Sequence, residues 1–361
     1  MKQYLDLLHH IVDCGVEKES GRANMPNTIG VSHSTIKMDL SDGFPLLTTK
    51  KMYWKGIIHE LLWFLSGNTN IKYLVDNNVN IWNGDAYRWY LKWWNEIGNT
   101  IDGIGKLETI DDFISQVKQD NNPAYEPEFE WHYDRTDNWG VYTVGDLGKV
   151  YGYQWRNQNG VDQVKEVLDG LKNNPYSRYH IIDGWNKADF SEMALPPCHL
   201  LYQFIVRPLS FEERETLLYK LIGHRLPFEY TKDEIVRDLD NANIPKFYLD
   251  LNMYQRSVDT LLGCPFNLAS MSLLLMLFAK ASNMISGVAT WVGGDTHLYL
   301  NHIPMVSEQV NRVPYKLPNL LIKKDIDSLA DILELTINDF ELKNYISHPA
   351  IKAELFTGLK K

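Results

Sequence analysis

Two stretches of the chain are apolar around almost a full helix, and they constrain the fold more than any other feature of the sequence. Residues 268–282 are mostly apolar, and residues 56–65 (GIIHELLWFL) contain a single carboxylate, Glu60. A helix of this kind is stable only when it is buried on all sides. The longest uninterrupted apolar run, Leu273 to Ala279, is far shorter than the roughly 20 residues that span a bilayer. We therefore expect core helices of a soluble protein and no membrane anchor.

The net charge argues against a nucleic-acid partner. The 361 residues include 36 Lys and Arg against 46 Asp and Glu, a net charge of −10, whereas a protein that binds duplex DNA normally carries a basic excess. The chain is 44% hydrophobic and 23% charged, which is typical of a globular protein with a sizeable core. Its length fits either two domains of ordinary size or one large domain.

Cysteine usage and the N-terminus indicate a reducing compartment. Cys14, Cys198 and Cys264 form no CxxC pair and no even set, as is typical of cytosolic proteins. The first 20 residues have acidic and histidine residues among their apolar positions, which predicts an amphipathic helix instead of a signal peptide. We expect a cytoplasmic protein, in the host cytoplasm if a phage encodes it.

The spacing of apolar residues predicts an α+β fold, with long helices against a mixed or mostly antiparallel sheet. Beyond the N-terminal helix, the predicted helices cover 56–65, part of 68–82, 110–117, 161–172, 210–221, 231–239 and 268–282, and the predicted strands cover 180–182, 201–206, 247–254, 288–293 and 318–323. Ser210 and Thr231 stand at helix starts, where a hydroxyl can accept a first-turn amide, and Glu234 completes a capping-box pattern. Residues 84–145 become rich in Trp, Tyr, Asp and Asn, which suggests an insertion with one helix followed by loop.

Cys198 is the cysteine with the most constrained surroundings. It follows two prolines in LPPCHL, and because proline fixes φ and disfavours helix before it, the thiol should lie at the rigid start of a strand. Taken alone, a single cysteine is more often a small buried apolar residue, and the alternative is a nucleophile. Cys14 and Cys264 lack comparable surroundings, so the apolar interpretation holds for them.

Polar residues in YQRSVD (254–259) and GCPFN (263–267) have the chemistry to bind a nucleotide. Arg256 is always charged and can hold a phosphate bidentately, and Ser257 adds a hydroxyl. An arginine near a thiol also favours the nucleophilic thiolate. The amide of Asn267 matches the O4 and N3–H edge of uracil. For each residue taken alone, a surface arginine or a turn asparagine is the ordinary alternative.

The segment GGDTHLYLNH (293–302) supplies a further polar set. His297 and Tyr299 are two residues apart, so they share one face of a strand. With Asp295 and His302 a metal site is conceivable, but the spacing is not a strong ligand pattern. Two polar side chains that hold a sugar hydroxyl are the better interpretation.

In their order along the chain, these stretches together resemble the folate-dependent, cysteine-nucleophile class of thymidylate synthases, in the family that also includes the pyrimidine hydroxymethylases. The stretches are DGFPLLTTKK (42–51), IIHELLWFLSG (57–67), GDLGKVYGYQWR (145–156), MALPPCH (193–199), YQRSVDTLLGCPFN (254–267), GGDTHLYLNH (293–302) and HPAIKA (348–353). The resemblance implies one catalytic domain over residues 1–361, with a small-domain insertion at about 86–144 and a hairpin insertion at 207–248. It also implies a three-layer α+β fold in which helices pack a mixed sheet and a sheet face forms a homodimer interface.

The resemblance implies reductive methylation of dUMP to dTMP, with 5,10-methylenetetrahydrofolate as one-carbon donor and reductant and without a metal. Cys198 would add to C6 of uracil, because C5 is otherwise a poor nucleophile. Glu60 would act through water as general acid and base, and Tyr151 would take part in removing the C5 proton. The apolar surroundings of Glu60 should raise its pKa by desolvation.

The same resemblance assigns the binding residues. The dUMP ligands would be Arg22, Arg178, Gln255, Arg256, Ser257, Asn267, His297 and Tyr299, and the folate ligands would be Trp82, Asp259, Leu262, Gly263 and Phe266. Arg178 would reach across the dimer interface to the partner's phosphate site. Arg256 would also lie beside the thiol, and Asp259 would help to activate the folate.

The chain departs from the family at several positions. Tyr179 replaces the second of two adjacent arginines, Asp85 replaces a second tryptophan after Trp82, and the loop GRANMPN around Arg22 is altered. The chain also continues as ELFTGLKK past the usual close. Because the family's C-terminus excludes water from the site, a looser tail would favour a dUMP hydroxymethylase, which is the alternative function. The retained Trp82 favours methylation, and Asn267, where cytosine-acting relatives commonly carry Asp, favours uracil.

Overall fold

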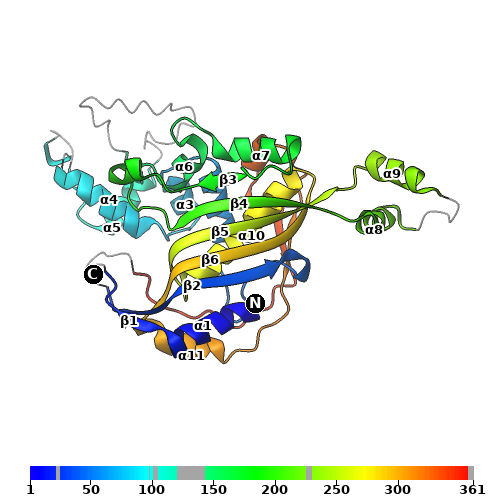
Figure 1. Cartoon of the computed structure of the whole chain (residues 1–361). Helices are drawn as coiled ribbons and strands as arrows, with labels where there is room; N and C mark the ends of the chain where they lie inside the picture. Colours follow the sequence, from blue (N-terminus) through cyan, green and yellow to red (C-terminus); the bar gives the residue numbers. More distant parts are fainter. Residues whose placement is uncertain (22–24, 97, 101–104, 120–142, 225–229, 357–361) are drawn as a thin grey trace.

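A six-stranded mixed sheet forms the centre of the protein (Figure 1). The computed structural model describes all residues except 22–24, 97, 101–104, 120–142, 225–229 and 357–361. The strands follow the order β1-β2-β6-β5-β4-β3, with β5 and β6 parallel and the other neighbours antiparallel. Their bounds are β1 Val16–Lys18, β2 Thr28–Asp39, β3 Ile181–Asp183, β4 His199–Pro208, β5 Phe247–Asp259 and β6 Ile285–Tyr299. A separate pair consists of β7 Asn319–Ile322 and β8 Phe340–Lys343.

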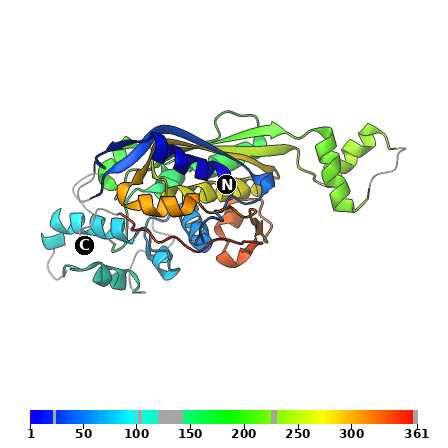
Figure 2. The ribbon, with the colours of Figure 1, turned by 90° about the horizontal axis from the view of Figure 1, so that it is seen from below.

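The helices gather mainly on one side of the sheet (Figure 2). They are α1 Lys2–Cys14, α2 Trp54–Leu65, α3 Lys72–Asp76, α4 Asn83–Glu96, α5 Ile110–Val117, α6 Tyr151–Asn157, α7 Gln163–Asn173, α8 Phe211–Ile222, α9 Lys232–Asn241, α10 Gly263–Ala281, α11 Ile303–Val310 and α12 Leu329–Leu333. Helices packed on a mixed sheet define the α+β class that the sequence predicts.

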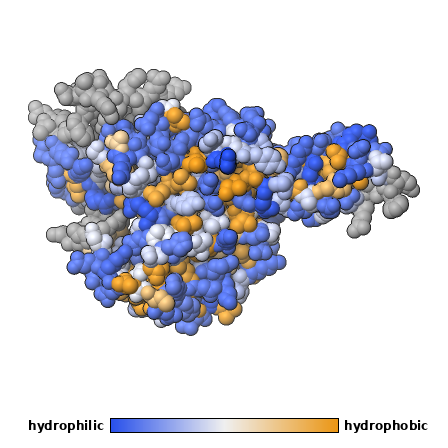
Figure 3. All heavy atoms as spheres, viewed as in Figure 1, coloured by the Kyte–Doolittle hydropathy of each residue, from blue (hydrophilic) through white to orange (hydrophobic). Residues whose placement is uncertain are grey.

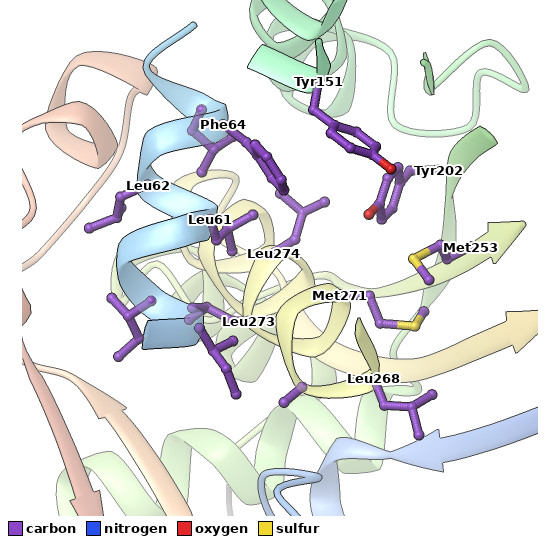
Figure 4. Close-up of a cluster of buried hydrophobic side chains, with 14 of the residues drawn as sticks. Leu61, Leu62, Phe64, Tyr151, Tyr202, Met253, Leu268, Met271, Leu273 and Leu274 are labelled. Atoms are coloured by element: carbon purple, nitrogen blue, oxygen red, sulfur yellow. The ribbon is translucent and has the colours of Figure 1, made fainter. Parts of the chain in front are cut away.

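The two apolar stretches form the helices α2 and α10, as expected. Nine of the twelve residues of α2 and fourteen of the nineteen of α10 are buried. Figure 4 shows Leu61 and Phe64 of α2 beside Leu274 of α10, with Tyr202 of β4 and Met253 of β5 also in the cluster. The helices therefore occupy a layer between the sheet and the outer elements.

Helix α10 corrects one expectation about membranes. Among the described residues it is the one helix that is long and apolar enough to cross a bilayer, with 19 residues from Gly263 to Ala281. The longest uninterrupted apolar run, taken from the sequence, indicated too short a length for this apolar helix. The helix begins five residues before the predicted start, and polar residues interrupt its apolar ones. Within the protein, 78% of its most apolar window is buried, which is typical of a core helix.

The two faces of the sheet differ in burial. On β5, Leu249, Leu251 and Met253 are buried under α10, whereas their neighbours are partly or largely exposed. The other face carries exposed apolar side chains such as Ile205 and Tyr254. Figure 3 shows apolar side chains gathered over the strands on this face.

Aromatic residues hold the described part of the first insertion together and belong to the same core cluster as α2 and α10. In the described part of the insertion, Tyr87 and Tyr90 of α4 lie against Phe113 of α5, with ring centroids 5.4 and 5.5 Å from the Phe113 ring. The sequence predicts α5 but misses α4, whose alternating aromatic and polar residues do not show a simple apolar face. The predicted loop after α5 lies largely outside the described residues.

The second insertion is an arm that projects from the body (Figures 1 and 2). Strands β4 and β5 stay paired out to Pro208 and Phe247, and α8 and α9 then form a helical hairpin with its own small cluster around Leu218, Leu239 and Ile244. Both helices begin with capping boxes, as predicted from Ser210 and Thr231.

Candidate active site

Cys198 lies immediately before strand β4, as the two prolines predict. Its backbone N–H donates to the hydroxyl of Tyr151 at 2.7 Å, and its carbonyl accepts from the backbone N–H of Arg256 at 2.9 Å. The pairing of β4 with β5 shifts between His199 and Leu201, a bulge that redirects side chains next to the thiol. The thiol is half-buried, whereas Cys14 is exposed and Cys264 is fully buried. The apolar interpretation thus fits Cys264 but is wrong for Cys14.

Arg256 fastens the segment that carries the thiol. Its Nε and Nη2 donate to the carbonyls of Pro197 and Pro196, both at 2.8 Å. Its guanidinium also lies 5.8 Å from the centre of the Trp185 ring. A guanidinium has five N–H donors, so these two bonds leave donors for an anion. The arginine can therefore both hold the segment before Cys198 and bind a negatively charged ligand.

Tyr151 is positioned by a tight contact between helix α6 and the segment before the thiol. Gly148, three residues earlier, has a left-handed φ of 71°, and a Cβ there would lie 2.1 Å from the carbonyl oxygen of Glu192. Only glycine fits so close an approach. Tyr151 is buried, and desolvation followed by the nearby Cys198 raises the pKa of its phenol well above the usual value. Its hydroxyl therefore keeps its proton at neutral pH.

Glu60, which is half-buried, pairs with the buried Trp82. The indole Nε1 of Trp82 donates to Oε1 of Glu60 at 2.8 Å. Burial raises the pKa of Glu60 to about 7, as its apolar setting predicts, while the bond from Trp82 opposes the rise. The Trp82 ring also lies 5.9 Å from the ring of Tyr151, whose hydroxyl accepts from the backbone N–H of Cys198. A carboxyl group that titrates near neutral pH can both give and take a proton.

Asn267 contacts a residue that the sequence interpretation leaves without a role, His199. Their side chains are hydrogen-bonded, and the hydroxyl of Tyr202 lies 2.9 Å from Nδ1 of the same histidine. Burial lowers the pKa of His199 to about 4, so the ring is neutral and fixes the orientation of the amide. The one sequence signal for a role of His199 is its place directly after the candidate nucleophile Cys198.

Asp259 is the last residue of strand β5, four residues before the start of helix α10 at Gly263. Its Oδ1 accepts from the backbone N–H groups of Leu261 and Leu262, at 3.0 and 3.1 Å. These bonds fix the carboxylate and direct its other oxygen away from the loop. Of the remaining predicted folate ligands, Gly263 starts α10 and Phe266 lies half-buried one turn later.

The predicted sugar ligands lie on strand β6. His297 and Tyr299 share one face, with ring centroids 5.5 Å apart, and Nδ1 of His297 lies 3.4 Å from Oδ1 of Asp295. Ser257 of β5 pairs with Asp295 across the parallel strands. Within the described residues, no group of three or more His, Cys, Asp and Glu side chains could hold a metal ion.

Two predicted dUMP ligands, Gln255 and Arg178, have their side chains directed elsewhere than to the segment that carries the thiol. Gln255 is buried, and its Oε1 accepts from Nε1 of Trp291 at 2.8 Å, so its amide oxygen is bonded within the protein interior. Arg178 and Tyr179 lie exposed between α7 and β3, with 89% of Tyr179 accessible. Arg22 lies outside the described residues. Asp85, which replaces the family's tryptophan, pairs with Arg88 at 2.5 Å.

The site therefore combines a half-buried thiol, an arginine bonded to the segment just before it, and a carboxyl group whose pKa is raised to about 7. Such groups suit covalent nucleophilic catalysis. Comparison with known proteins identifies the family. The family model described as thymidylate synthase matches residues 2–357. The chain therefore belongs to the thymidylate synthase family.

Individual relatives agree with this assignment over the full length. The thymidylate synthase of Malacoplasma penetrans is 39% identical over 357 residues, covering 98% of this chain and 99% of that protein. The thymidylate synthase of Mycoplasma mobile is 40% identical over 355 residues, with the same shares covered. That of Mycoplasma pneumoniae is 38% identical over 357 residues, again with 98% and 99% covered. All three are named thymidylate synthase, so the hydroxymethylase alternative is not supported.

Proposed function

We propose that the protein converts dUMP to dTMP with 5,10-methylenetetrahydrofolate as one-carbon donor and reductant. Membership of the thymidylate synthase family makes the chain a methyltransferase. The observation that carries the proposal is the linked set of Cys198, Arg256 and Tyr151, in which the side chains of Tyr151 and Arg256 hold the backbone of residues 196–198 by three hydrogen bonds. The substrate, the cosubstrate and the roles of single residues are inferred from this geometry together with the family.

Covalent addition of the thiolate to C6 of uracil is the first chemical step in this proposal. The addition makes C5 nucleophilic, which uracil alone does not achieve. The guanidinium of Arg256 is bonded to the carbonyls of the two prolines just before Cys198, and a positive charge near a thiol favours the thiolate. Asn267, held by the neutral His199, offers an acceptor and a donor to the O4 and N3–H edge of the base.

Two groups with raised pKa values handle protons. Glu60, with a pKa of about 7, exchanges protons with the uracil ring of the substrate through water. Tyr151, held protonated by burial, cannot act as a base by itself at neutral pH. Its hydroxyl instead accepts from the N–H of Cys198, and it can orient a water that passes the C5 proton on to the carboxylate of Glu60.

The folate cosubstrate supplies the one-carbon group and the hydride when it is bound. Its proposed contacts are Trp82, Asp259, Leu262, Gly263 and Phe266. Two observations support this side of the site. One oxygen of Asp259 is occupied by backbone N–H groups while the other points away from them, and an aromatic wall of Trp82 and its neighbours stands beside Glu60. A ring that carries N–H groups fits a fixed carboxylate beside such a wall.

A homodimer, with the sheet face as its interface, is part of the same proposal. Apolar side chains such as Ile205 and Tyr254 on that face (Figure 3) are the support within this chain, because such patches mark interaction surfaces. Arg178, exposed on its loop, would serve the phosphate site of the partner subunit. We also propose one catalytic domain over residues 1–361 with the two insertions, and a cytoplasmic location.

Incubation of the purified protein with dUMP and methylenetetrahydrofolate tests the proposed reaction. The expected result is dTMP formation with an equal amount of dihydrofolate, followed by absorbance. Cys198→Ala should abolish turnover and keep nucleotide binding measurable. Residual dTMP synthesis by that variant, at more than a trace of the unmodified rate, would refute the role of the thiol. A Cys14→Ala variant is the matched control and should keep full activity, since Cys14 lies exposed on α1.

A further inference from the structure

His302 lies where three functional parts of the protein meet. It ends the short turn Leu300–His302 directly after β6, and only 1% of it is exposed. Its Nε2 lies 3.0 Å from the carbonyl oxygen of Glu354 in the C-terminal tail, and its Nδ1 lies 3.8 Å from Oδ2 of Asp259. The ring therefore stands between the tail and the carboxylate proposed to bind folate.

Phe356 of the tail also makes ring contacts with His302 and with Tyr299. The ring of Phe356 lies 5.3 Å from that of His302, nearly parallel at 26°, and 4.7 Å from that of Tyr299. Tyr299 and His302 are themselves 5.6 Å apart at 81°. Residues 354–356 thus form a seated tail that is fixed by one hydrogen bond and two ring contacts. These three residues lie within residues 2–357, the range that the family model matches.

The hydrogen bond to the tail determines which nitrogen of His302 carries the proton. A carbonyl oxygen only accepts, so Nε2 must be the donor, and a neutral imidazole then presents a lone pair at Nδ1. Nδ1 has no hydrogen-bond partner in the described part of the chain, and 3.8 Å from Asp259 is too long for a hydrogen bond. Because Oδ1 of Asp259 is occupied by two backbone N–H groups, the lone pair of His302 faces the oxygen that remains for a ligand.

We propose that His302 is a positioning residue through which the seated tail keeps Oδ2 of Asp259 available to the N–H groups of the folate ring. The proposal rests on the proposed function. When the tail is seated, Nε2–H is committed to Glu354 and His302 offers Asp259 no proton. When the tail leaves, the proton can move to Nδ1, and the histidine then competes with the ligand for the same oxygen. The tautomer of the His302 ring thus couples the seating of the tail to the binding of folate.

Two substitutions of His302 separate the bonds to its two sides. The amide of His302→Gln lies near the position of Nε2 and can restore the donor to Glu354. The amide of His302→Asn lies near the position of Nδ1, so it can donate to Asp259 but cannot reach the tail. We expect His302→Gln to keep the KM for methylenetetrahydrofolate within about 3-fold of the unmodified protein. We expect His302→Asn to raise that KM about 10-fold, the effect of one lost hydrogen bond to a charged group.

A second readout follows the tail itself. Carboxypeptidase release of the C-terminal residues, followed by mass spectrometry, should be faster in His302→Asn than in His302→Gln and the unmodified protein. Equal KM values and equal release rates for the two variants would overturn the proposal. Thermal unfolding shows whether each variant is folded.

Phe356→Ala keeps the test available if neither His302 variant folds. It removes the stacked ring from the tail and leaves the buried histidine unchanged. Faster tail release together with a raised folate KM is expected, and unmodified values of both would contradict the proposal. Absence of dTMP synthesis by the unmodified protein would instead refute the proposed function, since tail release is measured without turnover.

Discussion

Replacing Trp82 with Phe should move the pH dependence of catalysis in a direction that the structure fixes. The substitution keeps an aromatic ring beside Tyr151 but removes the indole N–H that donates to Glu60 at 2.8 Å. That bond lowers the pKa of Glu60, which burial has raised to about 7. A hydrogen bond to a charged group contributes about 1.5–3 kcal/mol, and one pKa unit corresponds to about 1.4 kcal/mol. Because water can replace part of the bond, we expect the pKa of Glu60 to rise by about one unit.

The assay is the pH profile of kcat/KM for dUMP, which reports the essential groups of the free enzyme. In the unmodified protein a limb near pH 7 should belong to Glu60, and Glu60→Gln should remove it along with most activity. In Trp82→Phe the limb should move up by about one pH unit. An unchanged limb, or a shift to lower pH, would refute the reasoning that this N–H opposes the effect of burial.

The same pair predicts a change in stability. The pKa of Glu60 in the folded protein, about 7, lies above the ordinary value of 4.5, so the folded protein binds more protons than the unfolded chain between these values. The contribution of Glu60 to the free energy of unfolding therefore falls as pH rises from about 4.5 to 7. Glu60→Gln should remove this slope, as measured by urea unfolding at several pH values.

Three further predictions follow from the packing of the site and the arm. Arg256→Lys should lower kcat/KM at least about 10-fold, because lysine cannot replace both bonds to Pro196 and Pro197, and a value within 2-fold of the unmodified protein would count against the fastening role. Asn267→Asp should raise the ratio of dCMP to dUMP turnover, measured by product analysis, and an unchanged ratio would argue against base reading. Leu239→Ala in the arm cluster should increase protease cleavage within residues 209–246 and leave turnover and the main unfolding midpoint nearly unchanged. Leu274→Ala in α10 should lower that midpoint, because it costs about 2–5 kcal/mol of the free energy of unfolding. Equal effects of the two leucine substitutions on the midpoint would show that the arm is not a separate packing unit.

The parts of the fold that follow from the sequence are those with strong local signals. The apolar helix α2, the capping boxes of α8 and α9, and the strand that brings His297 and Tyr299 to one face are all confirmed. Each depends on residues close together in the chain, where periodicity and capping chemistry act directly. The start of α10 is less accurate, because GCPFN resembles a turn although its proline is tolerated in the first helical turn.

The parts that do not follow are those determined by tertiary contacts. Strand β2 is not predicted, since its residues Thr28–Asp39 alternate polar and apolar side chains weakly and gain their pairing from β6. The role of His199 becomes visible only when Asn267 and Tyr202 are seen on either side of it. The contacts of the tail with His302 join residues 52 positions apart, and no local pattern encodes them.

The central claim is that Cys198 is the nucleophile, and one measurement tests it most directly. The protein is incubated with 5-fluoro-dUMP and methylenetetrahydrofolate, digested, and the modified peptide is identified by mass spectrometry. The structure predicts an adduct on Cys198, which is half-buried and flanked by Arg256, and unmodified Cys14 and Cys264. An adduct on either of the other cysteines, or dTMP synthesis without any adduct at Cys198, would contradict the account.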